Sequence, residues 1–247
     1  MITKKPKSFL KVNNYIPFSP FFFKGFILII ISFLTLSISA EENYVLLNRA
    51  ADLFQKEKKE IKNYKVKQEV TSTVKESTGI VVEKRIQTGY FQYPDEYIFV
   101  CKEIEMNGIK QILAKPLIER INKSEVDWLS KEGLNSHNFQ TLSSDAKIVK
   151  YLVTPQKIQA GYFRGQIWID QETARIVKIL KEPIIKKKEL MKYSLDLNFE
   201  SKNVFQAPKS TRLFTIYQIN NRTTEISVDV RFEDYQYNLD ISKEIPK

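Results

Sequence analysis

Cysteine, histidine and glycine are scarce in this chain, and their scarcity removes several classes of site. Its 247 residues hold one Cys, one His and seven Gly. A single thiol, Cys101, cannot close a disulfide within the chain, and one Cys with one His cannot form a zinc-binding cluster. The patterns G-x-G-x-x-G, G-x-x-x-x-G-K-[ST], H-E-x-x-H and G-x-S-x-G are absent. We therefore expect no metal, no cofactor and no catalytic residues.

The remaining composition is that of a folded globular protein. Hydrophobic residues make up 43% of the chain and charged residues 28%, which is unlike disordered, collagen-like or coiled-coil sequences. The length allows one large domain or two small ones. We find no internal repeat, low-complexity segment or linker after Ala40.

Residues 1–40 differ from the rest of the chain. They carry five lysines and no acidic residue, and 26–38 is an apolar run broken only by Ser and Thr. Small residues up to Ala40 then precede Glu41-Glu42. This order is typical of a cleaved secretory signal peptide, so we expect 1–40 to be a signal peptide, 41–247 to be a single domain, and the protein to be periplasmic. The alternative is an uncleaved anchor that includes the apolar stretch Ile16–Phe23.

Much of the positive charge belongs to this segment. Removal of its five lysines lowers the formal charge from +10 to +5. Lys186–Lys188 is a basic run, which we interpret as a solvated face or a docking site for an acidic partner or anionic lipid. Nucleic acid is not an expected partner.

Hydrophobic periodicity predicts one helix followed mainly by strands. Leu46, Ala50, Leu53 and Phe54 recur at three- and four-residue steps, which predicts a helix over Glu41–Glu60. Asn107-Gly108 is a hairpin turn signal. Alternation of period two or flanking turns predict strands at Tyr64–Val74, Ile80–Tyr93, Glu96–Glu105, Ile109–Ala114, Ile148–Val153, Gln166–Asp170, Ala174–Lys181, Tyr193–Phe199, Leu213–Ile219 and Glu225–Phe232.

The stretch Lys115–Ser144 gives a weaker signal. Ser124 as a cap and Gly133 as a stop predict a short helix over Ser124–Lys131, and the rest of the stretch is expected to be irregular and polar. His137 is interpreted as a solvated loop residue. Cys101 is expected to be a small buried hydrophobe.

Aromatic residues concentrate in the predicted strands. A curved sheet wrapped around one helix either fills its interior with these side chains or leaves an apolar cavity that holds a hydrophobic ligand. Periodicity alone leaves both alternatives open.

Several segments resemble the LolA/LolB lipoprotein-carrier superfamily, to which RseB is related. They are the opening helix and first strand at Leu47–Val70, the Gly-strand-Pro-strand at Gly89–Phe99, the hairpin at Gly165–Lys178, the pre-strand Pro in Ala207–Ser210, and the end of the closing strand at Phe232–Tyr235. The resemblance implies a mainly β (α+β) fold. Its sheet would be a strongly curved antiparallel half-barrel of about nine to eleven strands, wrapped around the N-terminal helix and a small helical lid.

The resemblance also implies a function without catalysis. The leading hypothesis is an exported, monomeric carrier that shields the acyl chains of lipoproteins or other lipids, with membrane proteins as further partners. We expect the cavity to be lined by Tyr90, Phe99, Trp168, Leu197, Phe199 and Ile216. The alternatives are an envelope sensor or scaffold that binds a protein through the same fold and, third, an exported hydrolase that uses His137 and turn carboxylates.

Overall fold

A computed structural model describes residues 44–92, 96–122, 127–159, 162–185, 188–200, 205–240 and 245. The chain separates into two compact units, Met1–Glu42 and Asn43–Lys247, and the described residues all belong to the second. The predicted signal peptide lies outside the described residues.

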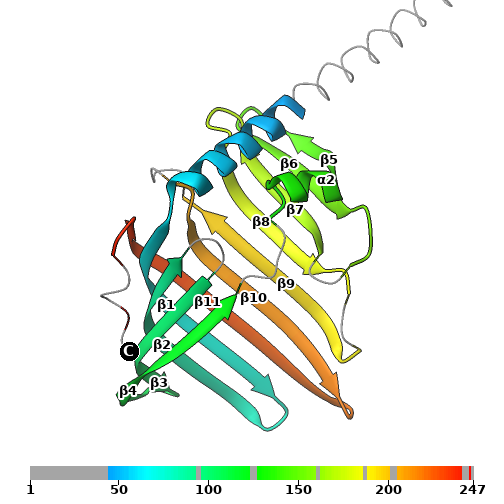
Figure 1. Ribbon diagram of the computed structural model, residues 1–247. Coiled ribbons are helices and arrows are strands. Elements are labelled where there is room, and N and C mark those ends of the chain that lie inside the picture. Colours follow the sequence, from blue (N-terminus) through cyan, green and yellow to red (C-terminus); the bar gives the residue numbers. More distant parts are fainter. Residues whose placement is uncertain are drawn as a thin grey trace, which may run out of the picture. The chain divides into compact units, whose positions relative to one another are not determined.

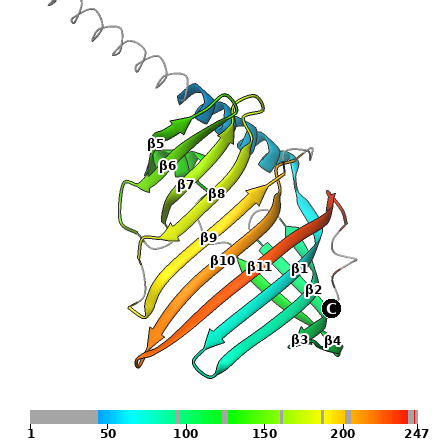
Figure 2. The same ribbon diagram turned by 180° about the vertical axis from the view of Figure 1, so that it is seen from behind.

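The described strands form one antiparallel sheet. In sheet order β4-β3-β2-β1-β11-β10-β9-β8-β7-β6-β5, only the β1–β11 pairing joins strands far apart in sequence (Figures 1 and 2). The strands are β1 (Asn63–Glu76), β2 (Gly79–Gln92), β3 (Glu96–Met106), β4 (Ile109–Asn122), β5 (His137–Ser144), β6 (Ile148–Pro155), β7 (Phe163–Asp170), β8 (Ile176–Pro183), β9 (Leu190–Phe199), β10 (Pro208–Ile219) and β11 (Arg222–Tyr237). The 11 strands of this curved, open sheet agree with the predicted half-barrel of about nine to eleven strands.

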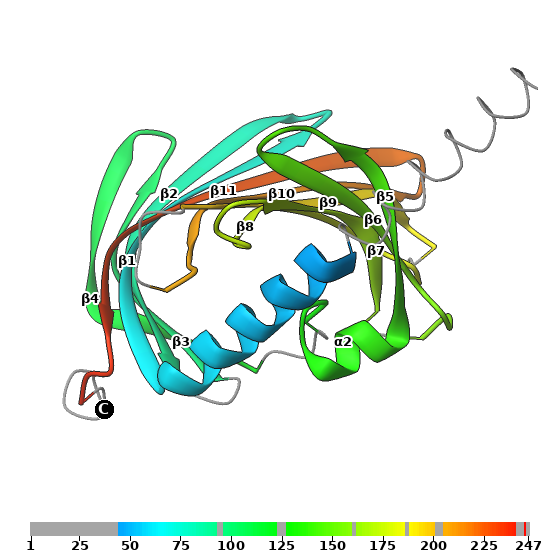
Figure 3. The ribbon, with the colours of Figure 1, turned by 90° about the horizontal axis from the view of Figure 1, so that it is seen from above.

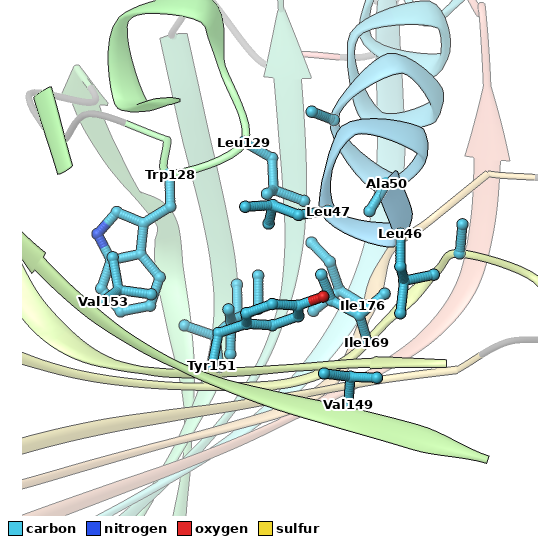
Figure 4. Packing of buried hydrophobic residues seen from close by; sticks show 14 residues of the cluster. Leu46, Leu47, Ala50, Trp128, Leu129, Val149, Tyr151, Val153, Ile169 and Ile176 are labelled. Atoms are coloured by element: carbon cyan, nitrogen blue, oxygen red, sulfur yellow. The ribbon is translucent and has the colours of Figure 1, made fainter. Parts of the chain in front are cut away.

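A helix over 44–60 lies within the curve of this sheet, as Figure 3 shows. Its buried side chains, Leu46, Leu47, Ala50 and Ala51, pack against one face of β6, β7 and β8 (Figure 4). The helix prediction is thus confirmed over its described part. No helix in the described part of the chain has the length and apolarity needed to cross a membrane.

The two faces of the sheet differ in chemistry. We call the face toward the helix the inner face and the opposite one the outer face. Ile167 and Ile169 of β7 are fully buried on the inner face, whereas Trp168 between them lies on the outer face beneath Lys150 and Lys178. On β7, strand alternation therefore places aliphatic side chains on the inner face and a tryptophan covered by lysines on the outer face.

Two strands contradict the expectation for Lys115–Ser144. β4 continues through Pro116 to Asn122, and β5 occupies His137–Ser144. Both are edge strands, and Pro116 lies at an irregularity in the β3–β4 pairing. Proline is tolerated at an edge or a bulge because no ladder hydrogen bond is required there.

The second helix is also displaced from its predicted position. Of the predicted helix, residues 127–130 form a turn and only Lys131 is helical, as the first residue of α2 (Lys131–Ser136). Ser130 caps it, since its Oγ accepts a hydrogen bond at 3.0 Å from the Gly133 amide; Ser124 lies outside the described residues. Trp128 and Leu129 are buried in the core, so the segment is anchored by those two side chains before the helix begins.

The single cysteine and the single histidine of the chain both lie in the interior. Cys101 is buried, as predicted. The interpretation of His137 as a solvated loop residue is wrong, because His137 begins β5 and is only 2% exposed. Its Nδ1 lies 3.1 Å from the Gly133 carbonyl oxygen. Burial lowers the pKa of His137 below its usual 6.5.

Candidate functional site

A cavity of about 290 Å³ lies between the helix and the inner face of the sheet. The helix, β1, β2, β3, β8, β9 and the segment before β10 all contribute to its wall. The wall is mostly apolar, with a few charged and polar groups. The lining residues are Phe54, Glu57, Lys58, Ile61, Tyr64, Phe91, Tyr97, Asp127, Ile176, Ile179, Lys181, Leu195, Leu197, Phe199, Gln206 and Pro208.

Aliphatic side chains from β8 and β9 form one wall of the cavity. Leu197 pairs with Ile179 across β8 and β9, and Leu195 pairs with Lys181 one step along. Directly paired residues share a face of the sheet, so the alternation of β9 delivers Leu195, Leu197 and Phe199 to the same side. This wall arises from ordinary strand geometry.

Aromatic side chains from β1, β2 and β3 form the facing wall. The ring of Tyr64 stacks on Phe91 with centroids 5.0 Å apart, and Phe91 lies 5.0 Å from Tyr97. Register explains this set, since Tyr64 pairs with Phe91 and Phe91 with Tyr97. Burial raises the pKa of Tyr64 well above 10. Its hydroxyl therefore remains neutral, and the wall presents rings without a formal charge.

Charged groups on the helix side of the cavity are ion-paired. A Glu57 oxygen lies 2.8 Å from the Arg175 guanidinium, and its other oxygen accepts a hydrogen bond from the Gln206 amide at 2.7 Å. Lys58 lies 3.2 Å from Asp127. These contacts tie the helix to three other segments around the cavity.

Lys181 is the charged residue that β8 contributes to the wall. It is 7% exposed, and its Nζ lies 5.2 Å from the ring centre of Trp128 and 5.7 Å from that of Phe163. Such distances are within the range of cation–π attraction. The Lys181 ammonium group therefore packs against two aromatic rings in the interior.

Of the residues expected to line a cavity, Leu197 and Phe199 do line it. Phe99 lies on the same face of β3 as Tyr97, with ring centroids 6.4 Å apart. The structure therefore brings these three predicted residues to the inner face.

The other three predicted residues lie on the outer face. Tyr90 packs with Ile98 and Val100 in a separate cluster, Trp168 lies under lysines, and Ile216 pairs with Lys192. In each case the adjacent residue is the one that faces inward, because a shift of one residue reverses the side of every side chain in a strand.

Sequence reasoning missed most of the wall. Phe91 and Tyr97 were within predicted strands, and the correct phase of β2 and β3 would have found them. The sequence did hold an indication for Lys181, because a lysine follows Ile179 at the next inward-facing position of β8. It held no such indication for Glu57, because the polar, mostly charged run 55–60 predicts a solvated surface.

The described residues offer no metal site at or away from this cavity. Among them, no group of three or more His, Cys, Asp or Glu side chains could hold a metal ion. The mostly apolar cavity is suited to enclosing an apolar ligand, whose surface it would remove from water.

Comparison with known proteins gives structural likenesses only. No family model matches the chain, and no curated protein matches it. Solved structures that it resembles include a domain from Vibrio parahaemolyticus named for outer membrane lipoprotein sorting, at 12% identity and a TM-score of 0.42, with 78% of this chain and 94% of that chain covered.

Two further structures carry related names. A LolA superfamily protein from Nitrosomonas europaea is 11% identical, with a TM-score of 0.35 and coverage of 80% of this chain and 97% of that one. MucB from Pseudomonas aeruginosa, solved with MucA, is 8% identical, with a TM-score of 0.22 and coverage of 77% and 99%. The printed names of these structures include the LolA superfamily and outer membrane lipoprotein sorting.

Proposed function

We propose that this protein is an exported carrier that shields an acyl chain of a lipid or lipoprotein in its internal cavity. The observation that carries the proposal is the cavity itself, whose facing walls are the aliphatic β8–β9 row and the Tyr64, Phe91 and Tyr97 rings. The sequence resemblance to LolA/LolB carriers supports the same ligand class. The protein would bind and release this lipid without changing it chemically.

Burial supplies the driving force for such binding. Each CH₂ group moved from water into an apolar site gains about 0.8 kcal/mol, so ten of them gain roughly 8 kcal/mol. A volume of about 290 Å³ lies near the lower end of small-molecule sites. It suits a single chain, and a larger cargo would require the helix to move away from the sheet.

The helix is held by contacts that are reversible. Glu57–Arg175 and Lys58–Asp127 are ion pairs on the helix side of the cavity. Breaking them together would release this end of the helix. We propose that cargo enters and leaves by this movement.

Export is proposed from the segment 1–40. Its lysines, apolar run and small-residue end support a signal peptide and a periplasmic location. Mass spectrometry of the protein purified from its own cell envelope would report the mature N-terminus and any bound lipid together. An intact 1–40 segment in a cytoplasmic fraction would contradict export.

Cavity filling tests the binding site. Delipidated residues 41–247 are titrated with a fluorescent acyl-chain probe, and Leu197→Trp is compared with Ile216→Trp. Leu197 lines the cavity, whereas Ile216 lies on the outer face. We expect Leu197→Trp to weaken probe binding at least about tenfold and Ile216→Trp to leave it unchanged. Absence of probe binding by the unmodified protein would contradict the proposal.

A protein-binding scaffold is the second candidate, and the edge strand β4 favours it. Large apolar side chains are exposed there, with Ile109 68% and Ile112 86% exposed. An exposed apolar edge can pair with an added strand. A photo-reactive residue at position 112 that cross-links one stoichiometric protein, together with a lipid-free protein in native mass spectrometry, would favour the scaffold over the carrier.

A further inference from the structure

Five connections between strands lie at one rim of the sheet. They join β1 to β2, β3 to β4, β6 to β7, β8 to β9 and β10 to β11, and we call this edge the hairpin rim. Because every pairing in the sheet is antiparallel, these connections fall at the same ends of the strands. Figures 1 and 2 show the β1–β2 and β10–β11 turns side by side at this rim, away from the helix.

Each connection at the hairpin rim exposes a large apolar side chain. These residues are Ile80 and Val81 after the β1–β2 turn, Ile109 after the β3–β4 turn, Ile158 between β6 and β7, Ile185 and Met191 around the β8–β9 connection, and Ile219 before the β10–β11 turn. At the opposite rim, the β7–β8 turn 171–175 is described throughout and exposes no large hydrophobic side chain, and near the β5–β6 turn Leu142 is exposed. Apolar side chains held in water at all five turns of one rim indicate a contact surface.

The hairpin rim also carries more basic than acidic side chains. Four ion pairs at its connections balance themselves: Lys75–Glu225, Lys84–Glu105, Lys110–Glu103 and Arg164–Glu182. Beyond these pairs, the exposed charged side chains among the described residues of the five connections are Lys157, Lys188, Lys192, Arg222, Glu76 and Glu189. Lys188 is the described member of the basic run that the sequence suggested as a docking site. The rim is therefore complementary to a negatively charged surface.

We propose that the hairpin rim docks on an anionic lipid bilayer. The exposed isoleucines enter the boundary between head groups and acyl chains, while the lysines and Arg222 contact lipid phosphates. Removal of apolar side chains from water and attraction of basic side chains to anionic lipids both favour such binding. The inference goes beyond the carrier function, since it assigns a partner to the surface of the protein and does not depend on the content of the cavity.

The spacing of the apolar side chains favours a bilayer over a protein. They occur one or two at a time on five separate connections, with polar turn residues such as Asn107 and Asn220 between them. A protein interface has a packed, continuous apolar core, which this rim lacks among its described residues. A fluid bilayer accepts separate side chains at any spacing, so it is the partner that this arrangement fits.

Docking at this rim would bring the inner face of the sheet next to lipid. A row of directly paired residues crosses five strands near the rim: Tyr193, Thr215, Ile226, Val74 and Val81. Val81 belongs both to this row and to the rim. On β9, Leu195 of the cavity wall lies two residues beyond Tyr193 and so on the same face. A largely apolar surface therefore continues from the docked rim to the cavity.

The test measures partition of the protein into sedimenting vesicles. Residues 41–247 contain the whole compact unit 43–247, and they are mixed with phosphatidylethanolamine–phosphatidylglycerol vesicles or with neutral phosphatidylcholine vesicles. We expect partition into the anionic vesicles to be at least about tenfold stronger and to weaken as salt is added. The double variant Ile109→Ser/Ile219→Ser should lower it at least about fivefold, because two side chains no longer leave water.

Matched variants separate the hairpin rim from other exposed surface. Ile86→Ser/Ile121→Ser removes two exposed isoleucines of β2 and β4 that lie away from the five connections, and it should bind as the unmodified protein does. Lys157→Gln/Lys188→Gln should weaken binding to the anionic vesicles only. Circular dichroism verifies that each variant is folded.

A fluorophore reports which part of the protein meets the lipid. An environment-sensitive dye attached through a cysteine at position 109 should shift its emission to shorter wavelength on the anionic vesicles. The same dye at position 86 should not shift. Cys101 is buried, so the introduced cysteine is the accessible thiol among the described residues.

Three results would overturn the docking proposal. They are no partition into the anionic vesicles, an equal loss of binding in the two isoleucine double variants, and an equal dye shift at positions 109 and 86. Capture of one stoichiometric protein by a cross-linker at position 109, with no binding to vesicles, would assign the rim to a protein and also overturn it.

The docking proposal and the carrier proposal are tested separately. Leu197→Trp, which fills the cavity, should still bind the anionic vesicles. Ile109→Ser/Ile219→Ser should still bind the fluorescent acyl-chain probe. Loss of vesicle binding by Leu197→Trp would place the lipid contact in the cavity and overturn docking through the rim.

Discussion

Glu57 and Arg175, 118 positions apart in the chain, form an ion pair of 2.8 Å in the protein interior. Their side chains are only 9% and 16% exposed. The second Glu57 oxygen accepts a hydrogen bond from the Gln206 amide. The helix is thus fixed to the start of β8 and to the segment before β10 by directional contacts as well as by apolar packing.

Removing one member of this pair should destabilise the fold strongly. Glu57→Ala leaves a poorly solvated guanidinium without its carboxylate, and we expect the free energy of unfolding to fall by about 3–5 kcal/mol. Urea unfolding monitored by circular dichroism measures the change. The exposed pair Lys75–Glu225, with side chains 58% and 41% exposed, provides the control, because Lys75→Ala should cost less than about 1 kcal/mol. Equal effects of the two substitutions would contradict the structural role assigned to Glu57.

Gly165 should not accept a side chain. An added Cβ would collide with the Leu180 carbonyl oxygen and crowd the Trp128 ring. We expect Gly165→Ala to lower the free energy of unfolding by on the order of 3 kcal/mol, at the upper end of the usual cost of core overpacking. Gly108→Ala is the control, since its surroundings are open and only its φ of +85° opposes a side chain; about 1–2 kcal/mol is expected. Thermal unfolding of both variants would decide the comparison, and a Gly165→Ala protein as stable as Gly108→Ala would show that β7 and β8 are less closely packed.

His137 should make the protein less stable in mild acid. Because burial lowers its pKa, the unfolded state binds a proton at pH values where the folded state does not. The stabilising contribution of the neutral imidazole is therefore complete above about pH 6.5 and is lost as the pH falls through the lowered folded pKa. Uptake of one proton can change the free energy of unfolding by at most about 1.4 kcal/mol per pH unit.

The measurement is the urea midpoint at pH values from 7.5 to 5. The unmodified protein should lose stability over this range more steeply than His137→Gln, which has no group to protonate there. Parallel curves would mean that the imidazole takes up its proton without unfolding.

The two tryptophans should report opposite faces of the sheet. Trp128 is 3% exposed in the core, whereas Trp168 lies on the outer face with Lys150 4.9 Å from its ring centre. The variant Trp168→Phe should emit at short wavelength and resist quenching by acrylamide. Trp128→Phe should emit at longer wavelength and be quenched several-fold more strongly. Similar quenching of the two variants would contradict the assignment of inner and outer faces.

The sequence predicted most strands because their signals are local. The Asn107-Gly108 turn and the alternation in Glu225–Phe232 depend on residues next to one another in the chain, and both correspond to observed elements. The continuation of β4 beyond Ala114 and the whole of β5 were missed, because edge strands are exposed on one side and lack a clean alternation. The position of α2 was missed because burial of Trp128 and Leu129, which depends on distant strands, decided where the helix could begin.

The cavity was predicted less well than the fold. Composition indicated that aromatic side chains from curved strands surround an interior, and Leu197 and Phe199 lie on the wall of the cavity. The phase of β2, β7 and β10 depends on how each strand pairs with its neighbours, and this pairing is set by register across the sheet. Tyr90, Trp168 and Ile216 therefore face away from the cavity, and Phe91 faces into it.

The order of local elements in 43–247, with a helix first and a long series of antiparallel strands after it, was determined by the amino-acid sequence through hydrophobic spacing and turn residues. Which side chains meet was decided by the tertiary structure. Glu57 meets Arg175, and Lys181 meets the rings of Trp128 and Phe163, only because the curvature of the sheet around the helix brings distant segments together. Periodicity states that a side chain points to one face or the other, whereas register and curvature fix which face encloses the cavity.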